Sequence, residues 1–131
     1  MIHSRHLAMV ATVLLLGASL HAQMRRQGPM AEYNPARETT VKGTVVRTYI
    51  GPLNDLSILE ITVDGKALHL FLGPPDEVSK LKVAFPKGAV VEAIAMPGFK
   101  VNGEPAMLAR QITSGTQKVT LRDATGKPVW S

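Results

Sequence analysis

The chain has 131 residues, no cysteine and a formal net charge of +5, from 15 basic and 10 acidic residues. Without cysteine it forms no disulfide and offers neither a thiolate nucleophile nor a sulfur ligand for a metal. A charge of this size indicates solubility and weak attraction to anions, and it argues against a dedicated nucleic-acid surface.

Residues 1–22 have the pattern of a secretory signal peptide. Arg5 precedes an apolar run from Leu7 to Leu20, and the small residue Ala22 follows. The run is shorter than the roughly 20 residues that a membrane-spanning helix needs. We therefore expect cleavage after Ala22 and a periplasmic or secreted protein. The alternative is a retained anchor, because Leu20 is less usual than alanine at the third position before the cut.

Residues 23–37 contain glycine, two prolines and mixed charge, without an apolar period of 2 or 3.6. This composition predicts a flexible leader, followed by one domain over residues 38–131. The domain begins with a strand over residues 38–51, which is rich in β-branched residues. The buried face changes between Val45 and Val46, so we expect a bulge or sharp coil there, with Gly43 giving the backbone room to bend.

Residues 56–72 form the clearest structural pattern of the chain. Apolar residues alternate with polar ones on both sides of Asp64-Gly65. This dipeptide is typical of a two-residue turn, so the segment is predicted to be a β-hairpin.

Residues 73–88 break the strand pattern. Asp76 and Glu77 follow two prolines, and apolar residues recur at Val78, Leu81 and Phe85. These features predict a helix of two to three turns that ends at Pro86.

Two further strands are predicted over residues 89–98 and 104–112. Between them lies a loop with a second turn signal at Asn102-Gly103. Residues 117–130 are expected to form a last, small β-ribbon.

This order of elements is that of an OB-fold: a five-stranded Greek-key barrel with one short helix between its third and fourth strands. The ribbon at the C-terminal end is an addition. A plain meander or a β-sandwich remains the alternative, because one strand order is compatible with several topologies.

Four segments, "VKGTVV", "LHLFLGPP", "AMLARQI" and "LRDATGKPVW", together resemble a family of small exported bacterial OB-fold proteins. That family is commonly labelled nucleic-acid-binding or uncharacterised. The likeness covers about residues 40–130, and its most distinctive part is the final "LRD..G.P.W". The resemblance implies an OB-fold and a periplasmic location. It implies no reaction, because fold does not determine function.

Catalytic and metal-binding motifs are missing from the sequence. After removal of residues 1–22, His69 is the one histidine left, and the acidic residues are scattered. No Ser-His-acid arrangement or glycine-rich phosphate loop can be assembled. We therefore expect no enzyme activity, no cofactor and no metal.

The candidate binding surface is the outer face of the 56–72 hairpin with its flanking loops. Strand alternation places Ile58, Glu60, Thr62, Ala67, His69 and Phe71 on that face. The ligand-binding candidates are Tyr49, His69, Phe71, Phe99 and Lys100. Phe71 has a second interpretation as an apolar residue covered by the leader or by a partner.

We expect a non-enzymatic, monomeric binding module for an envelope protein or a small ligand. The alternative is weak binding of single-stranded nucleic acid or another anionic polymer. Aromatic residues would stack on the bases, and cations would contact the phosphates. The negative charge of Glu60 would repel the phosphates.

Arg110 and Trp130 each have two interpretations. Arg110 shares the phase of Leu108 and Ile112, so it is either an ion-pair partner of an acid such as Glu92 or Asp123, fixing the ribbon, or a ligand contact. Trp130 is either a plug that closes the barrel or a recognition surface, and the plug is preferred because one indole buries roughly 150 to 250 Å².

Overall fold

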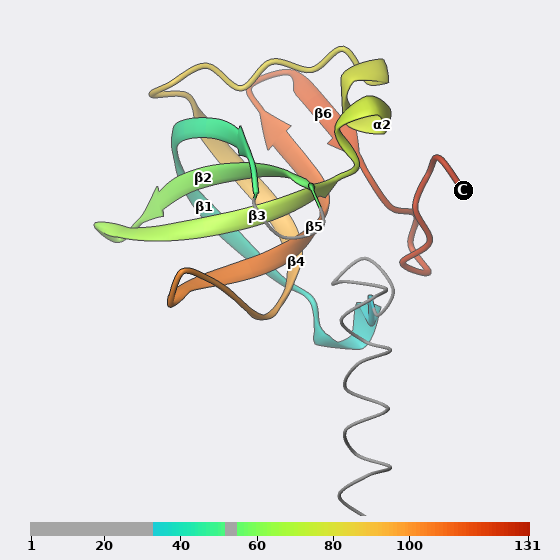
Figure 1. Cartoon of the computed structure of the whole chain (residues 1–131), viewed down its shortest axis with the longest axis horizontal. Coiled ribbons are helices and arrows are strands. Elements are labelled where there is room, and N and C mark those ends of the chain that lie inside the picture. Colours follow the sequence, from blue (N-terminus) through green and yellow to red (C-terminus); the bar gives the residue numbers. More distant parts are fainter. Residues whose placement is uncertain (1–32, 52–54) are drawn as a thin grey trace, which may run out of the picture. The chain divides into compact units, whose positions relative to one another are not determined.

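The protein is described by a computed structural model covering residues 33–51 and 55–131 (Figure 1). The predicted signal peptide and residues 23–32 of the predicted leader lie outside the described residues, as do residues 52–54 of the first loop.

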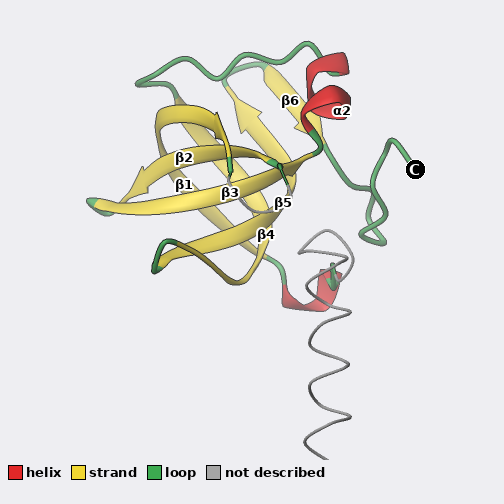
Figure 2. Cartoon of the chain, in the orientation of Figure 1, coloured by secondary structure: helices red, strands yellow, loops and turns green. Residues whose placement is uncertain are grey.

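The described chain is mainly β-structure (Figure 2). Its elements are η2 (Pro35–Arg37), β1 (Thr39–Ile50), β2 (Ser57–Val63), β3 (Lys66–Gly73), α2 (Pro75–Lys80), β4 (Val90–Val101), β5 (Glu104–Ser114) and β6 (Gln117–Thr120).

The strands form a closed barrel of the predicted OB-fold type. The sheet order is β3-β2-β1-β4-β5-β6, and a parallel pairing of β3 with β5 closes the first five strands into a barrel. The sixth strand, β6, extends the sheet by pairing antiparallel with β5. This closure confirms the five-stranded barrel and contradicts the alternative of a meander or sandwich.

The long strand β1 serves both halves of the barrel. Its first half, Thr39 to Thr44, pairs with β4, and its second half pairs with β2. The register shifts between Val45 and Arg47, which confirms the predicted bulge. A Cβ on Gly43 would lie 2.6 Å from the Thr62 carbonyl oxygen, so only glycine lets the two strands approach this closely.

Both predicted two-residue turns are confirmed. Asp64 and Gly65 have φ values of 51° and 77°, and Asn102 and Gly103 have values of 49° and 80°. Two consecutive positive φ values are the requirement of the tight hairpin turn. The second turn is tighter than expected, because the predicted loop before it is part of β4, which continues to Val101.

The helix is shorter than predicted, and the prediction that it reaches Pro86 was wrong. α2 has six residues and ends before Leu81, and Lys82 adopts a φ of 52°. The next residues form neither helix nor strand, and Leu81, Val83 and Phe85 pack against the core at alternate positions. A spacing of two residues lets all three side chains face the core without a helix.

The core of the barrel is built mainly of aliphatic side chains, with the aromatic residues Phe85 and Trp130 at its margin. Its buried members include Val45, Leu59, Ile61, Leu70, Leu72, Ala93, Ala95, Ala109, Ile112 and Leu121. Trp130 is partly buried and packs against this cluster. Its ring lies over Gly73, where an added Cβ would approach Cη2 to 2.5 Å. This contact agrees with the interpretation of Trp130 as a plug.

Residues 33–37, the described end of the predicted leader, contact the barrel and the ribbon. Asn34 caps η2 through its side chain, and its backbone N–H donates to the Met96 sulfur at 3.1 Å. Tyr33 lies against Gly126, where an added Cβ would clash with its ring. These contacts join segments distant in sequence, and composition alone does not reveal them.

Candidate functional site

The outer face of β1, β2 and β3 carries a connected group of polar side chains, here called the His69 cluster: Arg47, Tyr49, Glu60, His69 and Glu104. Arg47 pairs across strands with Glu60, and Glu60 pairs with His69. Residues directly opposite one another in a sheet share a face, so these three form a row. Tyr49 is two residues beyond Arg47, and Glu104 begins β5.

His69 is the centre of the cluster. It is only 3% exposed, and both of its ring nitrogens have a partner. Nδ1 is 2.8 Å from the Tyr49 hydroxyl, and Nε2 is 3.0 Å from Oε1 of Glu104. An ionised carboxylate only accepts hydrogen bonds, so Nε2 carries the hydrogen, and in the neutral ring Nδ1 accepts from Tyr49.

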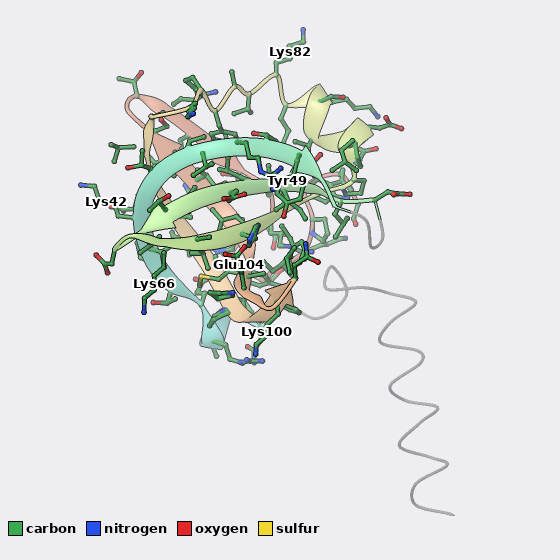
Figure 3. All side chains as sticks on the ribbon, turned by 60° about the vertical axis from the view of Figure 1, so that its left-hand side comes forward. Lys42, Tyr49, Lys66, Lys82, Lys100 and Glu104 are labelled. Atoms are coloured by element: carbon green, nitrogen blue, oxygen red, sulfur yellow. The ribbon has the colours of Figure 1, made fainter. Side chains whose placement is uncertain are left out.

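Tyr49, His69 and Glu104 are linked by hydrogen bonds, but their strands come from distant parts of the sequence. Tyr49 belongs to β1, His69 to β3 and Glu104 to β5. Figure 3 shows Tyr49 and Glu104 on the same face, on opposite sides of the ribbons of β2 and β3. The parallel pairing of His69 with Ala106 brings the start of β5 beside β3.

Arg47 and Glu60 form the outer part of the cluster. The Nε of Arg47 donates to Glu60 at 2.9 Å, and its guanidinium lies 4.3 Å from the centre of the Tyr49 ring. The side chain of Arg47 is 60% exposed, so this ion pair adds little stability but is accessible to a ligand. Burial raises the pKa of Tyr49, so its hydroxyl remains protonated at neutral pH.

The apolar residues that alternation places on this face, Ile58 and Phe71, are both covered. Phe71 is 8% exposed, because the ring of Phe99 packs on it edge to face at 5.9 Å. Ile58 is only 2% exposed although alternation places it on the outer face. The covering residue, Phe99, comes from β4, so neither the leader nor a partner is needed to bury Phe71.

Lys100 lies apart from the His69 cluster as an exposed residue of β4 at the margin of the face (Figure 3). It pairs with Pro105 next to the β4–β5 turn. The structure thus brings Tyr49 and His69 together and Phe71 and Phe99 together.

Sequence reasoning missed three members of the cluster as site residues: Arg47, Glu60 and Glu104. Alternation placed Glu60 on the correct face, and Arg47 shares that face beyond the bulge. Glu104 had no comparable signal, because its approach to His69 depends on the pairing of β3 with β5.

Arg110 has an acidic partner that was not among the two named in advance. Its Nε and Nη2 donate to the two carboxylate oxygens of Glu38 at 2.8 and 3.1 Å. The hydroxyl of Tyr33 donates to the same carboxylate. This ion pair therefore fastens the segment before β1, whereas the predicted role was to fasten the ribbon.

The ribbon is held by a different arginine, which the sequence analysis did not single out. Arg122 is 1% exposed, and its Nη1 donates to the Gly126 carbonyl at 2.6 Å. Its guanidinium also lies 5.4 Å from the centre of the Tyr33 ring. The backbone carbonyl of Arg110 accepts from the N–H groups of Leu121 and Arg122, which joins the ribbon to β5.

In the part of the chain that the structure describes, histidine, aspartate and glutamate do not gather into a group of three that could hold a metal ion. The same part contains no helix with the length and apolar character required to cross a membrane. No protein-family model matches the chain, and it matches no curated protein.

Proposed function

We propose that the protein is a non-enzymatic binding module of the bacterial envelope that recognises a protein partner or a small ligand through the His69 cluster. The observation that carries this proposal is the hydrogen-bonded chain from Tyr49 through buried His69 to Glu104. An apolar residue would fill the position of His69 without needing two polar partners. The histidine instead fixes the positions of a phenol and a carboxylate at the surface.

The chemistry of the cluster favours a polar ligand. The side chain of Glu104 is 51% exposed and that of Arg47 is 60% exposed, so an acceptor and a donor of the cluster both face solvent. Both lie on strands, which hold a site more rigidly than loops do. A ligand that carries both donors and acceptors would be bound with little rearrangement.

Photo-crosslinking in living cells tests this proposal. A photoreactive residue is placed at one of two flanking positions: Thr62, two residues beyond Glu60 on β2, or Lys100, at the margin of the face. Thr113 on β5 and Lys118 on β6 are exposed control positions. The full-length chain is expressed in its native host. We expect one defined adduct at the two flanking positions and none at the controls.

Tyr49→Phe and Glu104→Gln variants should weaken that adduct. Native mass spectrometry of the isolated protein covers the case of a small ligand, which should be retained by the wild type and lost from both variants. The proposal fails if adducts form equally at all four positions, or if neither method detects an occupant.

A titration with single-stranded oligo(dT) distinguishes the nucleic-acid alternative from binding of a protein partner or small ligand. The partly buried Glu60, the exposed Glu104 and the covered ring of Phe71 argue against it. Arg47, Lys100 and the partly exposed Phe99 support it. Binding at low salt that weakens steeply as salt rises would favour this alternative, because phosphate contacts release counterions.

The envelope location is the part of the proposal that rests on residues 1–22. The test is release by osmotic shock followed by mass spectrometry of the intact protein. We expect a mature chain that begins at Gln23. Intact chain with Met1 retained in the membrane fraction would contradict cleavage.

A further inference from the structure

We propose that the protonation state of His69 sets the direction of its hydrogen bond with Tyr49, and thereby decides whether the Tyr49 hydroxyl accepts from a ligand or donates to it. The inference deepens the function proposed above by assigning a regulation to the same site.

With His69 neutral, the direction of each hydrogen bond is fixed. Nε2 donates to Glu104 at 3.0 Å, so Nδ1 has only a lone pair and must accept from the Tyr49 hydroxyl at 2.8 Å. The phenol hydrogen then points inward. Only the lone pairs of the Tyr49 oxygen are left for a ligand.

When His69 takes up a proton from solvent, that proton resides on Nδ1, because Nε2 already carries one. Nδ1 then donates to the Tyr49 oxygen, and the phenol hydrogen turns away from the ring. No heavy atom has to move, because the distance between the two atoms suits either direction. The Tyr49 hydroxyl now offers a donor where it previously offered an acceptor.

The charged groups around His69 permit both states. Glu104 on β5 contacts Nε2 directly and becomes an ion-pair partner of the imidazolium. On β2, Glu60 lies opposite His69, but its carboxylate is engaged by Arg47 of β1. Lys100 of β4 is exposed at the margin of the face. Protonated His69 therefore has Glu104 as its charge partner, and protonation leaves no other charged group of the cluster buried without a partner.

The two states select different ligand groups. Neutral His69 favours a ligand donor at Tyr49, such as a hydroxyl, amide N–H or ammonium group. Protonated His69 favours a ligand acceptor, such as a carboxylate, phosphate or carbonyl oxygen. Acidification would therefore exchange one class of ligand group for the other at a single hydroxyl.

Nuclear magnetic resonance on the full-length chain tests the switch directly. Histidine is labelled with ¹⁵N and tyrosine with ¹³C at Cζ, and His69→Gln and Tyr49→Phe variants assign the resonances among four histidines and two tyrosines. At high pH we expect hydrogen on Nε2 and none on Nδ1. On acidification, the Cζ resonance of Tyr49 should shift with the same midpoint as the His69 nitrogens.

Tyr33 is the internal control, because its hydroxyl donates to Glu38 and lies outside the His69 cluster. Its Cζ resonance should not follow the His69 midpoint. The proposal is overturned if Nδ1 carries the hydrogen at high pH, or if Tyr49 does not respond when His69 is protonated.

The crosslink at Lys100, measured over the same pH range, tests the connection to binding. A yield that changes at the His69 midpoint in the wild type but not in Tyr49→Phe supports the regulatory role, and a yield independent of pH overturns it. If no crosslink forms at any pH, the proposed binding function fails, while the resonance data still decide whether the hydrogen bond reverses.

Discussion

The indole ring of Trp130 packs on Gly73 and leaves no room for a side chain there. Gly73 has a φ of +149°, and a Cβ there would meet the indole ring at 2.5 Å. Truncating a buried aromatic residue typically destabilises a protein by roughly 3 to 5 kcal/mol. Because Trp130 is only partly buried, we expect Trp130→Ala to lower the free energy of unfolding by about 2 to 4 kcal/mol, measured by urea denaturation.

Gly73→Ala should also destabilise the fold, by displacing the ring and by straining the backbone. In the Trp130→Ala background only the backbone strain remains, so the two losses should sum to more than the loss in the double variant. Val129→Ala is the control, because Val129 is 47% exposed beside Trp130 and should change stability by less than about 0.5 kcal/mol. Additive losses would contradict the proposed contact.

Glu38 predicts a pH dependence of stability. The hydrogen bonds from Arg110 lower the pKa of this carboxyl group, aided by the hydroxyl of Tyr33. A carboxyl with a lower pKa in the folded than in the unfolded state stabilises the fold above its ordinary pKa of about 4.3. This stabilisation is lost as pH falls through the lowered value.

We therefore expect Glu38→Gln to be less stable than the wild type at pH 7 and to lose less stability on acidification. Thermal unfolding over pH 2 to 7 measures both effects. Glu92→Gln, at an exposed position of β4, is the matched control and should leave the profile nearly unchanged. An unaltered acid profile in Glu38→Gln would show that the Arg110 pair does not contribute.

At the scale of residues, the sequence predicted which side chains carry polar chemistry better than it predicted their partners. Tyr49 and His69 were singled out, and they touch. The roles of Glu104 toward His69 and Glu38 toward Arg110 could not be predicted. Each pair is brought together by strand closure or by a segment folding back, and alternation along one strand contains no information about either.

At the scale of elements, substitutions at two glycines should destabilise the protein for different reasons: backbone strain at Gly65 and steric conflict at Gly43. Gly65 has a φ of 77° in the first hairpin turn, and an added Cβ there has no neighbour within 4 Å among the described residues. Gly43 instead faces the Thr62 carbonyl at 2.6 Å. We expect Gly65→Ala to lose about 1 kcal/mol through backbone strain alone, and Gly43→Ala to lose more because strand backbones must move apart.

Chemical denaturation of both variants measures this difference. Gly115→Ala serves as a second turn control, because Gly115 also has a positive φ, 61°, and open space at the Cβ position. It should resemble Gly65→Ala. If Gly43→Ala were as mild as the two turn variants, the close approach of β1 and β2 would not be a constraint.

Strands and turns were predicted well because their signals are local. Asp64-Gly65 and Asn102-Gly103 determine their own backbone conformation, whatever the rest of the chain does. The helix was overestimated because Val78, Leu81 and Phe85 fit a helical spacing, while Leu81, Val83 and Phe85 fit an extended one equally well. Packing against the barrel decides between them, and that packing is not a local property.

At the scale of the whole molecule, the order of elements was enough to predict the barrel type. It was not enough to predict which parts of the outer surface of the barrel stay exposed to solvent. The outer face of β3 was expected to be exposed, yet Phe71 is covered by Phe99 and His69 is enclosed by Tyr49 and Glu104. The covering residues come from β1, β4 and β5, so only the closed fold reveals them.

Strand β3 is buried on both faces over most of its length, and it lies between β2 and β5 in the closed sheet. Its backbone can therefore exchange amide hydrogens with solvent only when the barrel itself opens. We expect the most slowly exchanging amides of the protein to lie between Leu68 and Leu72, and those of the edge strand β6 to exchange much sooner. Hydrogen–deuterium exchange measures both.

Fast exchange in β3 would contradict this rigidity. If exchange there is slow, the histidine that holds Tyr49 and Glu104 is attached to the part of the chain that fluctuates least. Tyr49 and Glu104 would then keep their separation through the local openings of the barrel rim, so a ligand would meet the same spacing of groups at every encounter.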